Sequence, residues 1–277
     1  MSHPSKARPE ITPEKMPALM QEYMTLQNVH KAVMFSLVNK FAFVRVPKVA
    51  NSTLKFSIYN NERLAGTAKI RPSIIHDIHY GPVLRPALVG FDSDILYRVL
   101  FTDEFFRFAF VRNPYARVLS NYLDRYHAEN SVVRRFINRT ARKAGLIEDM
   151  SEGLSFPKFV RAVEAMHPKR MEIHSSHQTT QLMLGLVEYH RICAFEDLEN
   201  EWRSIASRLW KDYKPEFGNK SPSKTSAGEK LANYFLPDDI ARVNKVYEKD
   251  FEILGYPTLS DPSDFLQDGA LLRRPTS

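Results

Sequence analysis

Two segments of the chain share one order of features, in which an apolar strand is followed by a short polar turn and the start of a helix. The first is FAFVRVPKVANSTLKFSIYN, residues 41–60, and the second is FRFAFVRNPYARVLSNYLDRY, residues 106–126. Turns of this kind lie at the C-terminal edge of an open α/β sheet, where ligands bind. The pair therefore predicts a mainly parallel sheet flanked by helices, with a ligand site at one edge.

The first turn, PKVANST, is chemically suited to bind a phosphate group. Pro47 and Lys48 interrupt the apolar run, and Asn51, Ser52 and Thr53 open the expected helix. Backbone N–H groups, two hydroxyls and an ammonium can converge there on one anion, as they do in the P-loop. The glycines of the motif GxxxxGK[ST] are missing, so the turn differs from the usual nucleotide-binding loop.

The second turn carries a different anion-binding group. Arg112 ends the strand, Asn113 can cap the helix and Pro114 suits the first helical position. A guanidinium fork matches phosphate oxygens, and Ser120 can add a hydroxyl about two turns later. Taken alone, Arg112 could equally pair with a surface carboxylate and Ser120 could be a solvated helix residue. Two such turns in one chain nevertheless favour a ligand that is phosphorylated at both ends.

The remaining pattern alternates strands with helices, which is typical of an α/β fold with a mainly parallel sheet. Strands are expected at 40–46, 73–79, 105–111 and 190–195. Helices are expected at 14–28, 51–61, 92–100, 114–127, 155–166, 198–210 and 237–250. We expect one main domain at 31–257, preceded by an N-terminal extension and first helix at 1–30 and followed by a poorly ordered tail at 258–277.

Composition limits the class of protein. The chain is 43% hydrophobic and 26% charged, and no run of about 18 apolar residues suggests a membrane span. The N-terminus lacks the apolar core of a signal peptide, and Cys193 is the only cysteine, so no internal disulfide can form and a cytoplasmic location is expected. The net charge of +7 favours anionic ligands, with nucleic acid, acidic sugars and a nucleotide cofactor all open.

These motifs resemble those of the carbohydrate sulfotransferases that use 3′-phosphoadenosine 5′-phosphosulfate. PKVANST is similar to the family's PKxxxST turn, which holds the 5′-phosphosulfate, and FVRNPYARVLSNYLDRY to its FVRDPxxRLxSxYxDK, which holds the 3′-phosphate. HSSHQTTQL, RICAFEDL and VNKVYEKDFEILGY resemble its HWxPQ, IGxFExL and YxxDFxxFGY elements, in the family's order. Asn113 stands where many members have Asp, and Ser175 where they have Trp. Without the membrane anchor and cysteines of Golgi members, the chain looks like a soluble, bacterial-type member.

The resemblance implies a P-loop-like, three-layer fold and a sulfuryl transfer to a hydroxyl of a carbohydrate or glycoconjugate. The product would be adenosine 3′,5′-bisphosphate, and no metal is required because cationic side chains can stabilise the leaving group. Lys48 is expected to neutralise the charge that grows on the departing oxygen. The donor-binding residues are expected to be Pro47, Lys48, Ala50, Asn51, Ser52, Thr53, Arg112, Ser120 and Lys220.

The acceptor hydroxyl needs a base, and histidine is suited to that role at neutral pH. His76 and His79 rank first, because they lie in the region of the expected second strand, from which some related sulfotransferases supply the base. A structural role for each remains an equal alternative. HDIH has no accompanying Cys or carboxylate motif of metal-site spacing, which disfavours a metal site.

Two further groups are expected to bind the acceptor. The first comprises His174, His177 and Gln178. The second is the helical face of VVRRFINRTARK that carries Arg135 and Arg139. By default, this helical face is interpreted as a charged surface exposed to solvent. The alternative is that it binds an anionic acceptor.

Two other functions compete with sulfotransfer. A P-loop-type kinase would need the GK[ST] lysine and an aspartate for Mg²⁺ after an apolar strand, and neither is evident. A basic nucleic-acid-binding module would need a recognition motif or an aromatic platform, and we find neither. The expected partner is therefore a carbohydrate or glycolipid acceptor and not nucleic acid, and a lipid-linked acceptor would bring the protein to a membrane surface. Acceptor identity and oligomeric state do not follow from the sequence.

Overall fold

A five-stranded sheet with the strand order β3-β1-β2-β4-β5 forms the centre of the computed structural model, which describes residues 11–62, 83–84, 93–128, 131–213 and 226–273. The strands are β1 (Val33–Ser36), β2 (Phe41–Val44), β3 (Val83–Leu84), β4 (Phe106–Val111) and β5 (Arg191–Ala194). β4 pairs in parallel with β2 and β5, whereas β1 pairs antiparallel with β2 and β3. Four strands thus share one direction, which confirms the expected mainly parallel sheet.

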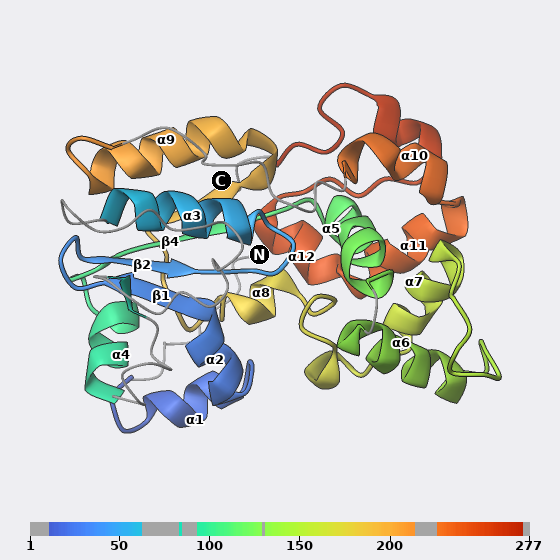
Figure 1. Cartoon of the computed structure of the whole chain (residues 1–277), viewed down its shortest axis with the longest axis horizontal. Coiled ribbons are helices and arrows are strands. Elements are labelled where there is room, and N and C mark those ends of the chain that lie inside the picture. The colour runs from blue at the N-terminus through green and yellow to red at the C-terminus, as the bar shows by residue number, and fades with distance from the viewer. Residues whose placement is uncertain (1–10, 63–82, 85–92, 129–130, 214–225, 274–277) are drawn as a thin grey trace, which may run out of the picture.

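Helices cover both faces of this sheet, which confirms the expected layered α/β fold. Figure 1 shows α3 (Asn51–Glu62) and α9 (Leu198–Leu209) on one face, and α1, α2 and α4 (Ser93–Phe101) on the other. β2 is apolar and buried at every position, as expected for a strand that is covered on both faces of the sheet. The rings of Phe43 in β2 and Phe108 in β4 stack at 5.3 Å between centroids.

The N-terminal part differs from the expectation of a single helix at 14–28. It forms α1 (Met16–Gln21) and α2 (Leu26–Ala32), and the Thr25 side chain caps the second helix by accepting from the Asn28 N–H at 3.3 Å. β1 was not expected, because it follows α2 directly with no turn residue between them. The expected strand at 73–79 lies outside the described residues.

A second group of helices lies beyond the C-terminal end of β4 (Figure 1). It comprises α5 (Pro114–Asn121) with the π-helical turn Tyr122–Tyr126, α6 (Val132–Lys143), α7 (Phe156–Glu164), α10 (Leu231–Tyr234), α11 (Pro237–Val246) and α12 (Glu248–Leu254). The short α8 (Gln178–Gln181) and 3-10 turns at Pro168–Arg170, Phe195–Asp197, Gly228–Lys230 and Pro262–Leu266 complete the described elements. The expected helix at 237–250 is interrupted at Tyr247, which has non-helical dihedrals. Within the described ranges, no helix is long and apolar enough to cross a bilayer.

The segment after Tyr256, for which the sequence suggested poor order, packs against the domain as far as Arg273. The Phe265 ring lies 5.2 Å from that of Tyr115 and 5.3 Å from that of Phe235. The Arg273 Nε donates to the Leu254 carbonyl at 2.7 Å. The aromatic contacts supply the burial that the sequence alone did not indicate for this segment. The other domain limits stay predictions.

Candidate active site

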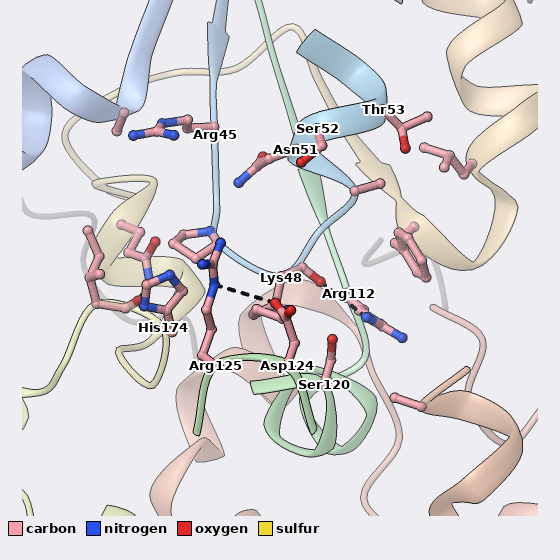
Figure 2. Close-up of a pocket in the computed structure, with 18 of the residues that line it drawn as sticks. Arg45, Lys48, Asn51, Ser52, Thr53, Arg112, Ser120, Asp124, Arg125 and His174 are labelled. Atoms are coloured by element: carbon pink, nitrogen blue, oxygen red, sulfur yellow. Dashed lines mark hydrogen bonds and ion pairs between the residues drawn. The ribbon is translucent and has the colours of Figure 1, made fainter. Parts of the chain in front are cut away.

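The two strand-to-helix turns meet in one cavity of about 800 Å³ (Figure 2). The first turn contributes Pro47, Lys48, Ala50, Asn51, Ser52 and Thr53, and the second contributes Arg112, Ser120, Asp124 and Arg125. β2 and β4 run in parallel, so the turns that follow them emerge at the same edge of the sheet. The expectation that both turns share the C-terminal edge is confirmed.

The first turn reaches its shape without glycine. Lys48 has φ 70° and Ala50 has φ 48°, so both adopt left-handed backbone conformations that ordinary residues rarely take. The Asn51 Nδ2 donates to the Val46 carbonyl at 2.8 Å and holds the turn closed. Conformations of this kind cost on the order of 1–3 kcal/mol each and cluster at ligand sites. The turn brings the N-terminus of α3 to the cavity, where its first amides have no helical carbonyl to bond.

Lys48 forms a buried ion pair with Asp124 (Figure 2). Its side chain is 9% exposed, and this burial lowers the pKa of Lys48 to about 8, against the opposing effect of Asp124. The ammonium is therefore still mostly charged at neutral pH. The Arg125 Nε lies 3.4 Å from the same Asp124 oxygen, so this carboxylate has two cationic partners.

Arg112 presents a buried cation to the same cavity. Its Nη1 donates to the Lys48 carbonyl at 3.2 Å, and its guanidinium carbon lies 4.3 Å from the centroid of the Phe195 ring. Burial lowers the pKa of Arg112 to about 10, against the opposing charge of Glu196, so the group stays charged at pH 7. Within the described part of the chain, the buried Arg112 Nε has no hydrogen-bond partner. A buried donor without a partner is costly, and an anion in the cavity would satisfy it.

Gln178 holds the backbone of Arg112 in place. Its Oε1 accepts from the Arg112 N–H at 2.9 Å and its Nε2 donates to the Arg112 carbonyl at 2.7 Å. Gln178 is fully buried, and its own N–H donates to Asp250 at 2.8 Å. The expectation that Gln178 binds the acceptor is therefore wrong, because both ends of its amide are engaged in the core.

The second turn is also anchored through Glu196. The Asn113 N–H donates to Glu196 Oε1 at 2.7 Å, and the Tyr256 hydroxyl donates to Oε2 at 2.8 Å. Burial raises the pKa of the Glu196 carboxyl. The Asn113 side chain caps α5 by accepting from the Tyr115 N–H at 3.0 Å. The motifs RICAFEDL and VNKVYEKDFEILGY thus supply supports for the turn that carries Arg112.

The expected acceptor-binding residues separate in the structure. His174 lies in the cavity wall, whereas the His177 Nε2 contacts the Val246 carbonyl at 2.7 Å and is not among the described residues that line the cavity. Arg135 and Arg139 are exposed on α6, and Arg139 lines a different cavity of about 420 Å³. Of this set, only His174 is among the described residues that line the cavity of the two turns.

Three expected site residues, His76, His79 and Lys220, lie outside the described residues. Among the side chains that are described, no group of three or more His, Cys, Asp or Glu could hold a metal ion.

Sequence reasoning missed several residues that line the cavity. Those with charged or aromatic side chains include Lys31, Arg45, Asp124, Arg125 and Phe195. One signal was available for Asp124, which lies four residues after Ser120 and so falls on the same side of a helix. Arg45 and Lys31 come from strand and helix ends whose meeting only the fold reveals.

Comparison with known proteins agrees with this geometry. The model of the sulfotransferase family matches residues 31–257. Human carbohydrate sulfotransferase 8 is 28% identical over 175 residues, which cover 59% of this chain and 39% of that protein. Human carbohydrate sulfotransferase 9 is 25% identical over 282 residues, 93% of this chain and 61% of that protein. Carbohydrate sulfotransferase 10 of Xenopus laevis is 23% identical over 242 residues, 79% of this chain and 65% of that protein.

The chain thus spans between 39% and 65% of the length of these three relatives. No solved structure matches it significantly. The family model covers most of the chain, including both turns and the motifs that support them. The chain therefore belongs to the sulfotransferase family.

Proposed function

We propose that this protein transfers a sulfuryl group from 3′-phosphoadenosine 5′-phosphosulfate to a hydroxyl of a carbohydrate or glycoconjugate. The observation that carries the proposal is the single cavity that joins Lys48 of one turn to the buried Arg112 of the other. Two cationic groups at separate points of one cavity suit a ligand that is phosphorylated at both ends. The names of the relatives support a carbohydrate as the acceptor.

The described residues fit this donor in separate roles. Ser52, Thr53 and the N-terminus of α3 would hold the 5′ side, because helix amides and hydroxyls suit an anion. The Arg112 guanidinium, whose Nε has no hydrogen-bond partner among the described residues, and Ser120 of the same cavity would hold the 3′-phosphate. The donor supplies an activated sulfuryl group on a phosphate oxygen.

Lys48 would act on the charge that develops during transfer. Its ammonium lies at the turn expected to face the 5′ side, and its pKa of about 8 leaves it charged at neutral pH. A fixed cation in a partly desolvated site stabilises growing negative charge more strongly than water does. The proposal requires no metal, because Lys48 and Arg112 already provide the neutralising charges.

A ligand-binding experiment separates this proposal from its two alternatives. Calorimetry should show that adenosine 3′,5′-bisphosphate binds more tightly than adenosine 5′-phosphate, which lacks the group expected to contact Arg112. Tight binding of ATP or of an oligonucleotide, with no binding of the bisphosphate, would instead support the kinase or the nucleic-acid module. A labelled-sulfate transfer assay over neutral glycans, acidic glycans and glycolipids then tests the reaction and the acceptor class.

A further inference from the structure

A carboxylate–histidine pair lies in the wall of the cavity. The Glu172 Oε1 is 2.7 Å from the His174 Nδ1, and the Glu172 Oε2 accepts from the His174 backbone N–H at 2.9 Å. One carboxylate thus holds both the ring and the main chain of the same histidine. The two side chains are 12% and 21% exposed, so the pair is largely but not fully shielded from water.

This contact determines which ring nitrogen can accept a proton. An ionised carboxylate only accepts hydrogen bonds, so the His174 Nδ1 must be the donor in their 2.7 Å contact. A neutral imidazole with hydrogen on Nδ1 carries its free lone pair on Nε2. The pair is therefore arranged as a general base.

The turn that carries the pair is fixed to the core. The N–H groups of Ser175 and Ser176 both donate to the Glu172 carbonyl, at 2.8 Å and 2.9 Å. The Ser175 hydroxyl accepts from Asn121 Nδ2 at 2.9 Å, and its carbonyl accepts from the Tyr247 hydroxyl at 2.6 Å. Ser175 therefore links this turn to α5. It occupies the position at which many members of the family that the sequence resembles have Trp. A base held in this way keeps its position relative to Arg112 and Lys48.

Figure 2 places His174 on the opposite side of Lys48 from Arg112, and all three residues line the same cavity. If Arg112 binds the 3′-phosphate and Lys48 the departing oxygen, an acceptor would approach from the side of His174. In-line transfer needs the attacking and departing oxygens on opposite sides of the transferred group. The order Arg112, Lys48, His174 in this view agrees with an acceptor that approaches from the side away from Arg112.

We infer that His174 is the general base that deprotonates the acceptor hydroxyl, with Glu172 as its positioning residue. The inference rests on the proposed function. As the acceptor oxygen forms its bond to sulfur, its proton moves to the His174 Nε2. The bond between sulfur and the 5′-phosphate oxygen breaks, and its electron pair stays on that oxygen beside Lys48. The imidazolium later releases its proton to water, which restores the neutral ring.

The cationic side chains of the cavity wall and Asp124 are less suited to this role. Lys31, Arg45, Lys48 and Arg125 are cationic residues in the same wall. Asp124 is already engaged in ion pairs with two of these cations, Lys48 and Arg125. Among the described histidines, only His174 lines the cavity.

The first test compares His174→Gln with His177→Gln, a control whose histidine lies outside the cavity lining. General bases contribute on the order of 100-fold or more, so His174→Gln should lower kcat by about that factor. Its affinity for adenosine 3′,5′-bisphosphate should not change, and His177→Gln should keep the wild-type kcat. Sulfate transfer retained by His174→Gln, or lost instead in His76→Gln or His79→Gln, would overturn the inference and leave the proposed function standing.

The second test examines the contact between Glu172 and His174 and does not depend on measuring sulfate transfer. Nitrogen-15 NMR of the donor-free protein should show neutral His174 with hydrogen on Nδ1, and Glu172→Gln should weaken this preference. Hydrogen on Nε2 in the wild-type protein would overturn the inference. A wild-type protein that transfers sulfate to no acceptor would overturn the proposed function, and the inference with it.

Discussion

The two anion-binding turns occupy the same position in the fold but are built differently. The first turn depends on its own backbone, with left-handed conformations at Lys48 and Ala50 and one side-chain bond from Asn51. The second turn depends on distant parts of the chain, because Gln178 and Glu196 bond its backbone from two other segments. One is a local structure, and the other is a part of the core.

Because the two turns are held differently, we expect mutations in them to have different consequences. Side chains of the first turn are partly exposed to the cavity, so their loss should affect ligand binding and chemistry more than folding. Every residue of α5 is buried, so changes around the second turn should affect folding as well. Four measurements test this contrast between the two turns.

The largest effect is expected for Gln178→Ala, which should lower the free energy of unfolding by about 3 kcal/mol. The change leaves the N–H and the carbonyl of Arg112 buried without partners, and each such group costs about 1–3 kcal/mol. The matched variant in the first turn is Asn51→Ala, which removes the hydrogen bond to the Val46 carbonyl at a half-buried site and should lower the free energy of unfolding by about 1 kcal/mol. Urea denaturation of both variants tests the contrast, and equal losses would show that the two turns are held alike.

Lys48→Ala should lower kcat by about 100-fold or more while affinity for adenosine 3′,5′-bisphosphate changes far less. An ammonium that acts on charge growing during transfer contributes to the transition state more than to the bound ground state. Arg125 still contacts Asp124 in this variant, so the carboxylate keeps a cationic partner. Steady-state kinetics give the change in kcat, and titration with adenosine 3′,5′-bisphosphate gives the change in affinity. A loss of affinity with kcat unchanged would make Lys48 a simple binding residue.

Arg112→Ala should weaken binding of adenosine 3′,5′-bisphosphate by more than about 1.5 kcal/mol, roughly tenfold. The matched ligand is adenosine 5′-phosphate, whose affinity should fall much less because it lacks the 3′-phosphate. Circular dichroism must first show that the variant is folded, since Arg112 is buried in the supported turn. Unchanged affinity for the bisphosphate in a folded variant would assign the 3′-phosphate to another residue.

The parts of the fold that were predicted correctly are those with strong local patterns. β2, β4 and β5 are apolar runs that end in polar turns, and the helices that follow β2 and β4 begin with capping residues or proline. β1 lacks any turn residue before it, so its pattern merges with that of α2. Its antiparallel direction depends on pairing with β2, which no local pattern specifies.

Site residues were predicted correctly only where the residues of a sequence motif also line the cavity. His174 and Gln178 lie four residues apart and were treated alike, yet one lines the cavity and the other is fully buried. The direction of a side chain depends on what packs against it, and here Asp250 and Arg112 hold Gln178 in the core. Asp124 became evident only as the partner of Lys48. The cytoplasmic location stays a prediction.

The last measurement is the pH dependence of the first turn. Burial lowers the pKa of Lys48 from its ordinary value of 10.5 to about 8, so kcat/KM should fall about tenfold per pH unit above pH 8. Bound donor phosphates would favour the charged ammonium, so the fall in kcat itself should lie at higher pH. Between about pH 8 and 10.5 the unfolded chain holds a proton that the folded chain has lost, so the contribution of Lys48 to stability rises with pH in this window.

Asp124→Asn tests whether Lys48 causes this alkaline limb. Asp124 raises the pKa of Lys48 through its hydrogen bond and its charge, so removing the charge should move the limb of kcat/KM below pH 8. Lys48→Arg provides the control, because arginine keeps its proton throughout this range and any remaining activity should lack the limb. Profiles of kcat/KM for the three proteins between pH 6 and 10, in buffers of constant ionic strength, would show the shift. A limb that stays in place in Asp124→Asn, or persists in Lys48→Arg, would assign the titration to another group and remove the link between the ion pair and catalysis.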